Sequence, residues 1–340
     1  MTRAIPESSG TGGTGATGAT SGTGGLAPMS TRPWTSGSVS VVIPTVGRPS
    51  LEAAVASVLA QSEPVGEIIV VADTAGPLAL PPHAKVRVIR TGPGAGGNVA
   101  RQSGIDYARG DIIALLDDDD TWFPDKIGTQ LELANKIPPA AREWVLGCSV
   151  VAVTPDGRRR VWPSRVIAPS QDLAEYIFVR HGLRRGHGFL QASGLMFPRD
   201  LGLDVPFRAQ LRFHQDITWL LDVTHRYPGI HVGQTTQPLV QYHVGAGSVS
   251  TAIRSGQSVA WAREHLASRS PRARGDFLIT VPVHYARRER SVRRAISAII
   301  AGFSLGRPSW RASAYAGASL GLISLDMSLA WFRWLRRTPN

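Results

Sequence analysis

Short apolar runs alternate with amphipathic segments through the first half of the chain. Residues 39–44 (VSVVIP) form a continuous apolar, β-branched run, which is typical of a strand buried on both faces. Strands alternating with helices in this way predict an α/β sheet that is mostly parallel, with helices on both faces. The predicted strands are 39–44, 67–73, 85–90 and 111–116, and the predicted helices are 51–61, 96–110 and 124–136.

The pattern becomes less regular in the second half of the chain and changes again near each end. Apolar runs predict strands at 144–153, 191–197 and 238–244, and one-sided apolar spacing predicts a helix over 215–225. From about residue 257 the pattern is helical and rich in arginine. We therefore expect three regions: a disordered Gly/Ser/Thr-rich tail over 1–37, a folded domain over 38–250, and a basic helical region over 251–340.

Composition and charge narrow the classes of function. The 340 residues contain 37 Lys and Arg against 25 Asp and Glu, a net charge of +12. The segment 281–340 holds ten arginines and two acids, so it contributes +8 and the rest of the chain only +4. This suits an anionic partner, but no aromatic-basic module predicts nucleic-acid binding. The single cysteine, Cys148, excludes an internal disulfide and a cysteine-based zinc or iron–sulfur site. No signal-peptide pattern is present, so we expect a cytoplasmic protein.

Four consecutive aspartates, residues 117–120, directly follow the apolar run 111–116. Ligands of parallel α/β sheets bind at the carboxyl ends of the strands, which is where this run falls. Adjacent carboxylates repel one another, and a hard divalent cation such as Mg²⁺ or Mn²⁺ compensates them. The aromatic residues Trp122 and Phe123 follow and favour a rigid loop. The run therefore predicts a metal-bound, phosphorylated ligand, although a solvated acidic turn is the simpler alternative.

Two other known motifs overlap this region. Residues 117–121 fit D-x-D-x-T of haloacid-dehalogenase-type phosphatases, but those enzymes place it after their first strand, and here it follows the fourth. Gly92, Gly94 and Gly97 fit the G-x-G-x-x-G of an NAD(P)-binding Rossmann oxidoreductase, and Asp117 follows at the spacing of that motif's ribose-binding acid. Two predicted strands and a helix precede the glycines, and four acids exceed the one that a ribose needs.

A larger ordered set of motifs resembles family 2 glycosyltransferases with the GT-A fold. The matching pieces are VSVVIPTVGRP, EIIVVAD, GGNVARQSGIDYARGDIIALLDDDDTWFPDKI and a later HQD on a helix. The similarity runs from about Val39 to Ser250, and the stretch from Gly97 to Gln130 is its most specific part. The resemblance implies a metal-dependent, inverting transfer of a sugar from a nucleoside-diphosphate sugar to a hydroxyl of a glycan, lipid-linked or small-molecule acceptor.

The resemblance also implies residues that bind the donor. Pro44, Thr45 and Arg48 correspond to the turn that cradles the nucleobase, and Arg101 to an arginine near the phosphates and ribose. Asp73 corresponds to the aspartate that bonds the base, or it caps the next turn. The family has two aspartates followed by Gly-Ser here, but this chain has Ala-Asp-Thr-Ala at 72–75. That departure motivates a non-catalytic alternative, a GT-A-like domain that binds a nucleotide or a partner without transfer.

Within the aspartate run, the resemblance makes Asp119 the principal ligand of Mn²⁺ or Mg²⁺ and Asp117 the first residue of the D-x-D motif. It makes Asp118 a ribose-binding or metal-shell residue, and Asp120 is expected to orient its neighbours. His243 either completes the metal shell, contacts a phosphate or is structural. Which two of the four aspartates contact the metal is left open.

The resemblance assigns the catalytic base to Asp216, at the start of the predicted helix 215–225. In the family an aspartate at this place, usually after another acid, removes the proton of the acceptor hydroxyl. Here the preceding residue is Gln215. The alternative is that Asp216 only caps its helix.

The C-terminal region contains an apolar stretch at 312–332, interrupted by Asp326 and followed by arginines. Its large apolar residues recur at helical spacing, which favours an amphipathic helix. Three interpretations remain open: a helix packed on the catalytic domain, an interfacial helix on anionic lipid at the inner face of the membrane, and a membrane span. The spaced residues are Leu320, Ile323, Met327, Trp331 and Trp334.

Overall fold

The computed structural model describes residues 33–138, 141, 143–182, 188–244 and 253–335, and for residues 324 and 326–335 it describes the backbone alone. Most of the predicted tail at 1–37 therefore lies outside the described residues, as do the side chains of Met327, Trp331 and Trp334. Residues 245–252 also lie outside them, so the domain boundary at 250 stays a prediction.

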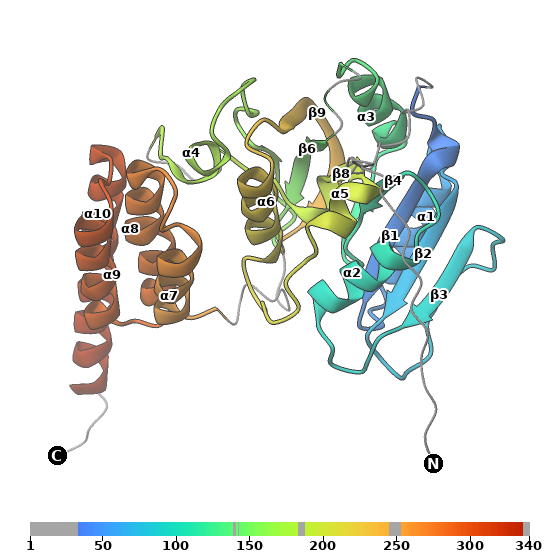
Figure 1. Ribbon diagram of the computed structural model, residues 1–340. Coiled ribbons are helices and arrows are strands. Elements are labelled where there is room, and N and C mark those ends of the chain that lie inside the picture. Colours follow the sequence, from blue (N-terminus) through green and yellow to red (C-terminus); the bar gives the residue numbers. More distant parts are fainter. Residues whose placement is uncertain (1–32, 139–140, 142, 183–187, 245–252, 336–340) are drawn as a thin grey trace, which may run out of the picture. The chain divides into compact units, whose positions relative to one another are not determined.

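The predicted strands of the first half all form, and they lie side by side in parallel (Figure 1). They are β1 (Val39–Thr45), β2 (Glu67–Ala72), β3 (Val86–Arg90) and β4 (Ile112–Leu115). Their order in the sheet is β3-β2-β1-β4, so the carboxyl ends of all four meet at one edge. This edge carries the aspartate run.

The second half extends the same sheet with mixed pairing. Beyond β4 the order continues β8-β6-β9-β5, and β7 pairs with β6. Only β6 and β9 pair in parallel, and the other contacts are antiparallel, so the expected parallel arrangement is concentrated in the first four strands. The bounds are β5 (Thr121–Trp122), β6 (Trp144–Val153), β7 (Arg159–Trp162), β8 (Met196–Pro198) and β9 (His231–His243).

The predicted strand at 191–197 is only partly correct. Its first part is a 3-10 turn, η2 (Ala192–Gly194), and only Met196–Pro198 pairs as a strand. The side chains of Gln191 and Ser193 both hydrogen-bond Asp120. In this turn both side chains contact the aspartate loop, and strand pairing begins only at Met196.

Helices cover both faces of the sheet, as predicted, and each face has its own apolar core. One core joins β1 and β2 to α1 (Leu51–Leu59) and α3 (Lys126–Ala134). The other joins the opposite face to α2 (Gly97–Tyr107), α5 (Arg199–Asp204) and α6 (Gln215–Arg226). Helix α2 lies very close to the sheet, since a Cβ on Gly104 would come within 2.3 Å of a methyl group of Val42. This close packing fixes the depth of Arg101 on the same helix.

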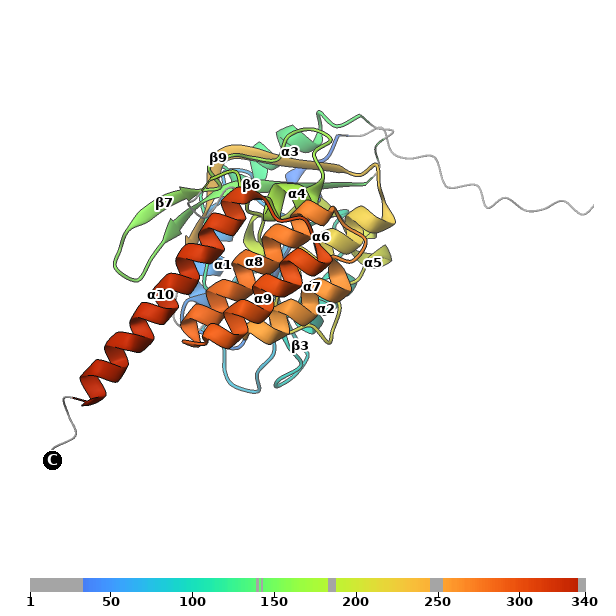
Figure 2. The ribbon, with the colours of Figure 1, turned by 90° about the vertical axis from the view of Figure 1, so that its left-hand side faces the viewer.

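The C-terminal region is helical, as predicted, and packs in layers beyond α6 (Figures 1 and 2). Helix α8 contacts α4, α7, α9 and α10. Phe277 on α8 packs against Phe178 on α4 and Trp261 on α7. Among the described residues, no helix is both long enough and apolar enough to cross a bilayer. The bounds are α4 (Leu173–Phe178), α7 (Ser255–His265), α8 (Pro271–Arg288), α9 (Val292–Leu305) and α10 (Trp310–Leu335).

Candidate active site

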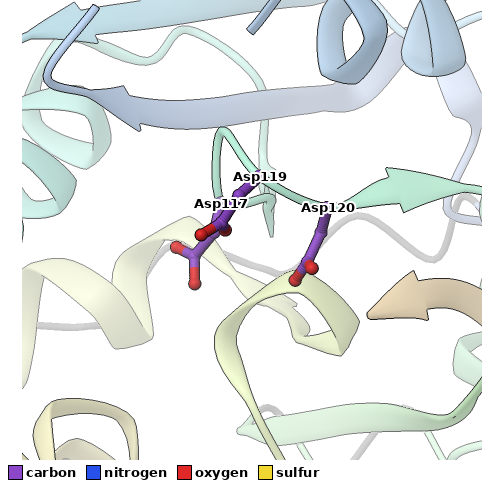
Figure 3. A group of neighbouring side chains, drawn as sticks. All are labelled: Asp117, Asp119 and Asp120. Atoms are coloured by element: carbon purple, nitrogen blue, oxygen red, sulfur yellow. The ribbon is translucent and has the colours of Figure 1, made fainter. Parts of the chain in front are cut away.

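Three carboxylates gather on the loop between β4 and β5. One oxygen from each of Asp117, Asp119 and Asp120 lies within 4.8 Å of the others (Figure 3). Asp117 and Asp119 are half-buried, whereas Asp120 is buried. We call residues 117–120 the aspartate rim. Its three clustered members offer only oxygen ligands, which is the donor set that Mg²⁺ and Mn²⁺ prefer.

The fourth member of the rim, Asp118, points toward β1 instead. Its carboxylate accepts a hydrogen bond of 2.6 Å from Thr45 Oγ1 and pairs with Arg48. Arg48 Nη1 also lies 3.5 Å from Asp119 Oδ2. Pro44 is buried at the end of the same strand. The structure therefore brings together four residues that the sequence assigned to donor binding, and it separates Asp118 from the clustered carboxylates.

Asp120 is held by three donors from two other segments. It accepts bonds of 2.6 Å from Ser193 Oγ, 3.1 Å from Gln191 Nε2 and 3.0 Å from the His243 N–H. Burial, reinforced by the charge of Asp117, raises the pKa of Asp120 to about 8. Gln191 and Ser193 are functional residues that the sequence alone did not indicate. Their only signal was two polar residues within the apolar run 191–197.

His243 supports the rim through its backbone and its ring. Its Nδ1 donates to the carbonyl oxygen of Asp119 at 2.7 Å, and its Nε2 lies 3.0 Å from the side-chain amide of Gln241. The histidine lies outside the group of three carboxylates. The ring therefore orients the rim, and its role as a metal ligand remains a prediction.

Arg101 connects the rim to the start of α6. Its guanidinium is buried, with Nη2 2.6 Å from Asp117 Oδ1 and Nη1 2.9 Å from the side-chain oxygen of Gln215. Nη1 also lies 3.9 Å from Asp216 Oδ1. Burial by itself would lower the pKa of Arg101, but the charges of Asp117 and Asp216 raise it above its ordinary value. One cation thus lies between the rim and the predicted base.

Asp216 is in the first turn of α6, and its side chain is 22% exposed. Its Oδ2 accepts a hydrogen bond of 2.9 Å from the Ala192 N–H of η2, so this carboxylate is tied to a second element as well as to its own helix. Burial raises the pKa of Asp216, and Arg101 opposes that shift. A fixed carboxylate with a raised pKa and partial exposure suits a general base.

The C-terminal helices contact the chain just before Asp216. His214 adopts a left-handed backbone conformation (φ 53°), and its ring centroid lies 4.6 Å from that of Trp261 and 5.6 Å from that of Phe277. Its Nε2 is 3.1 Å from Ser258 Oγ, and Trp261 Nε1 donates to Thr218 Oγ1 at 2.9 Å. Burial lowers the pKa of His214 to about 4, so the ring is neutral at physiological pH. Helices α7 and α8 therefore fix the start of α6.

Asp73 uses both of its carboxylate oxygens to hold the loop before α2. They accept bonds of 2.8 Å from the Ala95 N–H and 2.7 Å from the Gly96 N–H. A Cβ at Gly92 would lie 1.8 Å from Asp73 Oδ1, so only glycine fits there. This is the turn-capping arrangement that the sequence left open, and contact of Asp73 with a nucleobase stays a prediction.

Lys126 is a fully buried residue whose role the sequence did not indicate. Its Nζ donates to Gln130 Oε1 at 2.6 Å and lies 4.0 Å from the centre of the Trp122 ring. Gln130 and Trp122 in turn donate to the carbonyl oxygens of Gly194 and Ser193. Burial lowers the pKa of Lys126 to about 8. Lys126, Gln130 and Trp122 thus support η2, and through η2 they support the rim.

A separate hollow of about 600 Å³ lies at the opposite edge of the sheet, where the strands begin. The residues around it include Lys85, Arg87, Arg109, Glu67 and Asp111. None of the residues that line it belongs to the aspartate rim or to α6. Ligands of parallel sheets bind at the carboxyl ends, so we assign the chemistry to the rim.

Residues 40–191 match the sequence profile of the family described as Glycosyl transferase family 2. The matched range includes the rim and Arg101, and it ends at Gln191, before η2, Asp216 and His243. The α/β fold expected of that family is the fold observed.

Known proteins with similar sequences include three from bacterial polysaccharide biosynthesis. The chain is 28% identical over 161 residues to the amylovoran biosynthesis glycosyltransferase AmsB of Erwinia amylovora, covering 47% of this chain and 51% of that protein. It is 29% identical to the succinoglycan biosynthesis protein ExoO of Rhizobium meliloti, covering 59% of each. It is 36% identical over 102 residues to the putative teichuronic acid biosynthesis glycosyltransferase TuaG of Bacillus subtilis, covering 28% of this chain and 40% of that protein. The chain thus spans about half the length of the relatives it matches.

Among solved structures, residues 1–349 of S. aureus TarS in complex with UDP-GlcNAc align with a TM-score of 0.47 and 16% identity, covering 84% of this chain and 80% of that one. The sequence match over residues 40–191 makes this part of the chain, which carries the aspartate rim, similar to glycosyl transferase family 2.

Proposed function

We propose that the protein is a metal-dependent, inverting glycosyltransferase of polysaccharide biosynthesis, with a nucleoside-diphosphate sugar as donor and a glycan or lipid-linked hydroxyl as acceptor. One observation carries the proposal: Arg101 pairs with Asp117 of the rim and lies beside Asp216. A site for an anionic leaving group and a candidate base thus face each other across one buried cation.

The rim fits a divalent cation because its own charges are not balanced. Four carboxylates meet only two guanidinium groups, those of Arg48 and Arg101, among the residues that the structure describes. Burial and the charge of Asp117 raise the pKa of Asp119, and Arg48 offsets this only in part. Asp117, Asp119 and Asp120 would hold Mg²⁺ or Mn²⁺. When bound, such an ion would stabilise the negative charge that develops on a departing diphosphate.

The donor side of the site is built on the end of β1. Thr45, Arg48 and Asp118 form one hydrogen-bonded group there, with Pro44 beside them. Asp118 is fixed by two partners, so its carboxylate has a set orientation and would contact the ribose of the donor. Arg101 would attract the phosphates from the other side of the rim.

The acceptor side is built on the first turn of α6. Asp216 would take the proton of the acceptor hydroxyl as that oxygen attacks the anomeric carbon and the bond to the phosphate breaks on the opposite face. Its Oδ2 is held by the Ala192 N–H, which leaves the carboxylate oriented before substrate binds. A positioned base of this kind is typically worth about 100-fold to 10,000-fold in rate. The displacement occurs once, with inversion, and needs no covalent nucleophile.

Two observations bear on the alternatives. The N–H groups of Ala95 and Gly96, which a Rossmann site would offer to a pyrophosphate, already donate to Asp73, which disfavours the NAD(P) interpretation. A domain that binds without transfer would not need the Asp216 carboxylate to be partly exposed beside Arg101. Each alternative predicts a different result in the test below.

The test measures release of the nucleoside diphosphate. UDP, GDP, dTDP and NADH, each with Mn²⁺, are first compared by thermal shift to choose the donor series. We expect nucleotide release from the matching sugar donor with Mn²⁺ and little release with EDTA. Asp216→Asn should keep donor binding and lose release by about 100-fold or more. Asp222→Asn, on the same helix but paired with Arg208, is the matched control.

Metal-independent release at full rate, or normal turnover by Asp216→Asn, would contradict the proposal. Stabilisation by NADH alone would favour the oxidoreductase. Nucleotide binding without any release would favour the non-catalytic domain.

A further inference from the structure

Helix α9 has an exposed apolar row that no described residue covers. Ile296, Ile300 and Phe303 are separated by four and three positions, so they lie on one face of the helix. They are 42%, 60% and 57% exposed. The opposite face, with Ala295, Ala298 and Gly302, is buried against the other helices. The helix therefore buries small residues on one face and exposes three large apolar residues on the other, while Ile299 and Leu305 are half-buried against the cores.

Helix α10 extends this apolar surface. It contacts α9 and lies with it on the side of the helical region away from the sheet (Figures 1 and 2). Trp310 is 68% exposed, and Leu322 and Leu325 are also exposed. The exposed positions between them are uncharged as well, namely Ala314, Gly317, Ala318 and Gly321. Single exposed apolar residues are common on proteins, but two adjacent helices with uncharged apolar exposed rows are not.

Arginines surround this surface. Arg287, Arg288, Arg290 and Arg293 are exposed around the turn from α8 to α9. At the other end of α9 are Arg307, which is exposed, and Arg311, which lies 4.6 Å from the centre of the Trp310 ring. Over residues 281–325 the sequence contains a single acid, Glu289, and that acid pairs with Arg294. We call α9 with the described part of α10, and the arginines at their ends, the C-terminal surface.

We propose that the C-terminal surface docks on the headgroup region of an anionic lipid bilayer. Amphipathic helices bind there by burying an apolar face at the boundary of the acyl chains while cations contact lipid phosphates. An arginine beside an exposed tryptophan suits the same boundary, where both apolar and charged groups find partners. No described helix can span a bilayer, so the contact is peripheral. The proposal is independent of the transfer reaction.

Charge favours lipid over a second copy of the chain. Two-fold pairing of two α9 rows in antiparallel orientation would bring the Arg293 end of one copy against the Arg307 end of the other. Parallel pairing would bring the Arg293 ends together. Like charges meet in both cases. Glu289, the single acid of residues 281–325, already pairs with Arg294, so it does not neutralise them. An anionic bilayer supplies the missing negative charge.

The test is flotation of the full-length protein with vesicles of the neutral lipid DOPC, either alone or with roughly one third of the anionic lipid DOPG. We expect binding to the anionic vesicles and at least about tenfold weaker binding to DOPC. The double variant Ile300→Ser/Phe303→Ser should lose about tenfold or more on the anionic vesicles. The matched control is Val161→Ser, because Val161 on β7 is also exposed and lies beside exposed arginines but belongs to another surface.

A second pair of variants tests the charges. Arg293→Gln/Arg307→Gln should weaken binding to anionic vesicles by about fivefold for each arginine, and Arg158→Gln/Arg160→Gln on the β6–β7 hairpin should not. Circular dichroism checks that every variant is folded.

Two results would overturn the proposal. One is that the protein binds both kinds of vesicle equally, or that Ile300→Ser/Phe303→Ser binds anionic vesicles as well as Val161→Ser does. The other is a dimer, seen by light scattering without lipid, that Ile300→Ser/Phe303→Ser dissociates.

Discussion

The aspartate rim and the C-terminal surface carry opposite charges and are built in opposite ways. In the rim the carboxylates are buried or half-buried, and most of them are held by hydrogen bonds or ion pairs. The partners are Thr45 and Arg48 for Asp118, Arg101 for Asp117, and Ser193 for Asp120. On the C-terminal surface arginines and large apolar side chains are exposed. Buried charges in fixed positions suit catalysis at a single site. An exposed surface of charged and apolar side chains is stabilised only when a partner covers it.

The two regions are joined by the contact of α7 and α8 with the start of α6. Trp261 packs on His214 and donates to Thr218, and Asp216 lies between those two residues in sequence. The C-terminal helices therefore belong to the support of the active site as well as to a separate surface.

Trp261→Ala should have the largest effect on the free energy of unfolding. Trp261 is buried among Phe178, His214 and Phe277, so its loss should lower the free energy of unfolding by about 3–5 kcal/mol. Urea denaturation measures this. Trp310→Ala, in the exposed row of α10, is the control and should change stability by no more than about 0.5 kcal/mol. Equal effects of the two substitutions would show that the contact does not hold the regions together.

Ser193→Ala should have the next largest effect. Ser193 Oγ donates to the buried Asp120 carboxylate and accepts from the Asp117 N–H, so its removal takes away one of the three donors to Asp120 and the acceptor of the Asp117 N–H. We expect a loss of about 1.5–3 kcal/mol in the free energy of unfolding, together with weaker Mn²⁺ binding. Ser313→Ala, a half-buried serine on α10, should leave Mn²⁺ binding unchanged. Unchanged metal affinity in Ser193→Ala would argue that η2 does not position the rim.

His214 should make the protein less stable in mild acid. Its pKa is about 4 in the fold against an ordinary value of 6.5, so the unfolded chain gains a proton before the folded one as the pH falls. Stability is therefore lost as the pH drops below 6.5, by about 2 kcal/mol between pH 7 and pH 5. Unfolding at the two pH values should show this difference for the wild type and a smaller one for His214→Asn, which tolerates the same backbone conformation. The same pH dependence in both proteins would refute the assignment.

Arg208→Gln should have the smallest effect. Arg208 pairs with Asp222 on α6, but 46% of its side chain is exposed, so solvent screens the pair. We expect a change below about 1 kcal/mol in unfolding and no change in donor binding. A larger change would mean that surface ion pairs, rather than the aromatic contact, hold α6.

The sequence predicted the sheet edge and the aspartate rim, but it did not predict the residues that hold the rim in place. Parallel strands buried on both faces give unbroken apolar runs, so β1, β2 and β4 and the rim after β4 could be located. The conformation of η2 depends on Asp120, which lies more than 70 positions away in sequence, and a local pattern does not contain that information. Likewise, Asp73 was identified as a polar group at a strand end, but its N–H partners in the loop before α2 depend on the fold.

The C-terminal helices show the same division. Their helical character was predictable from spacing, but the position of Trp261 against His214 was not, because it joins residues 47 positions apart on different elements. The spacing also showed an amphipathic α10 without telling which face is buried. In the structure, α9 buries Ala295, Ala298 and Gly302 and exposes Ile296, Ile300 and Phe303.

The central claim is that the aspartate rim binds a divalent cation and, through it, a nucleoside diphosphate. Calorimetric titration of Mn²⁺ and of nucleotide with Mn²⁺ tests it most directly, on the wild type, Asp119→Asn and the exposed control Asp125→Asn. We predict saturable Mn²⁺ binding that strengthens nucleotide binding in the wild type and in Asp125→Asn, with both effects lost in Asp119→Asn. Nucleotide binding that is equally tight with and without Mn²⁺, or unchanged in Asp119→Asn, would contradict the account.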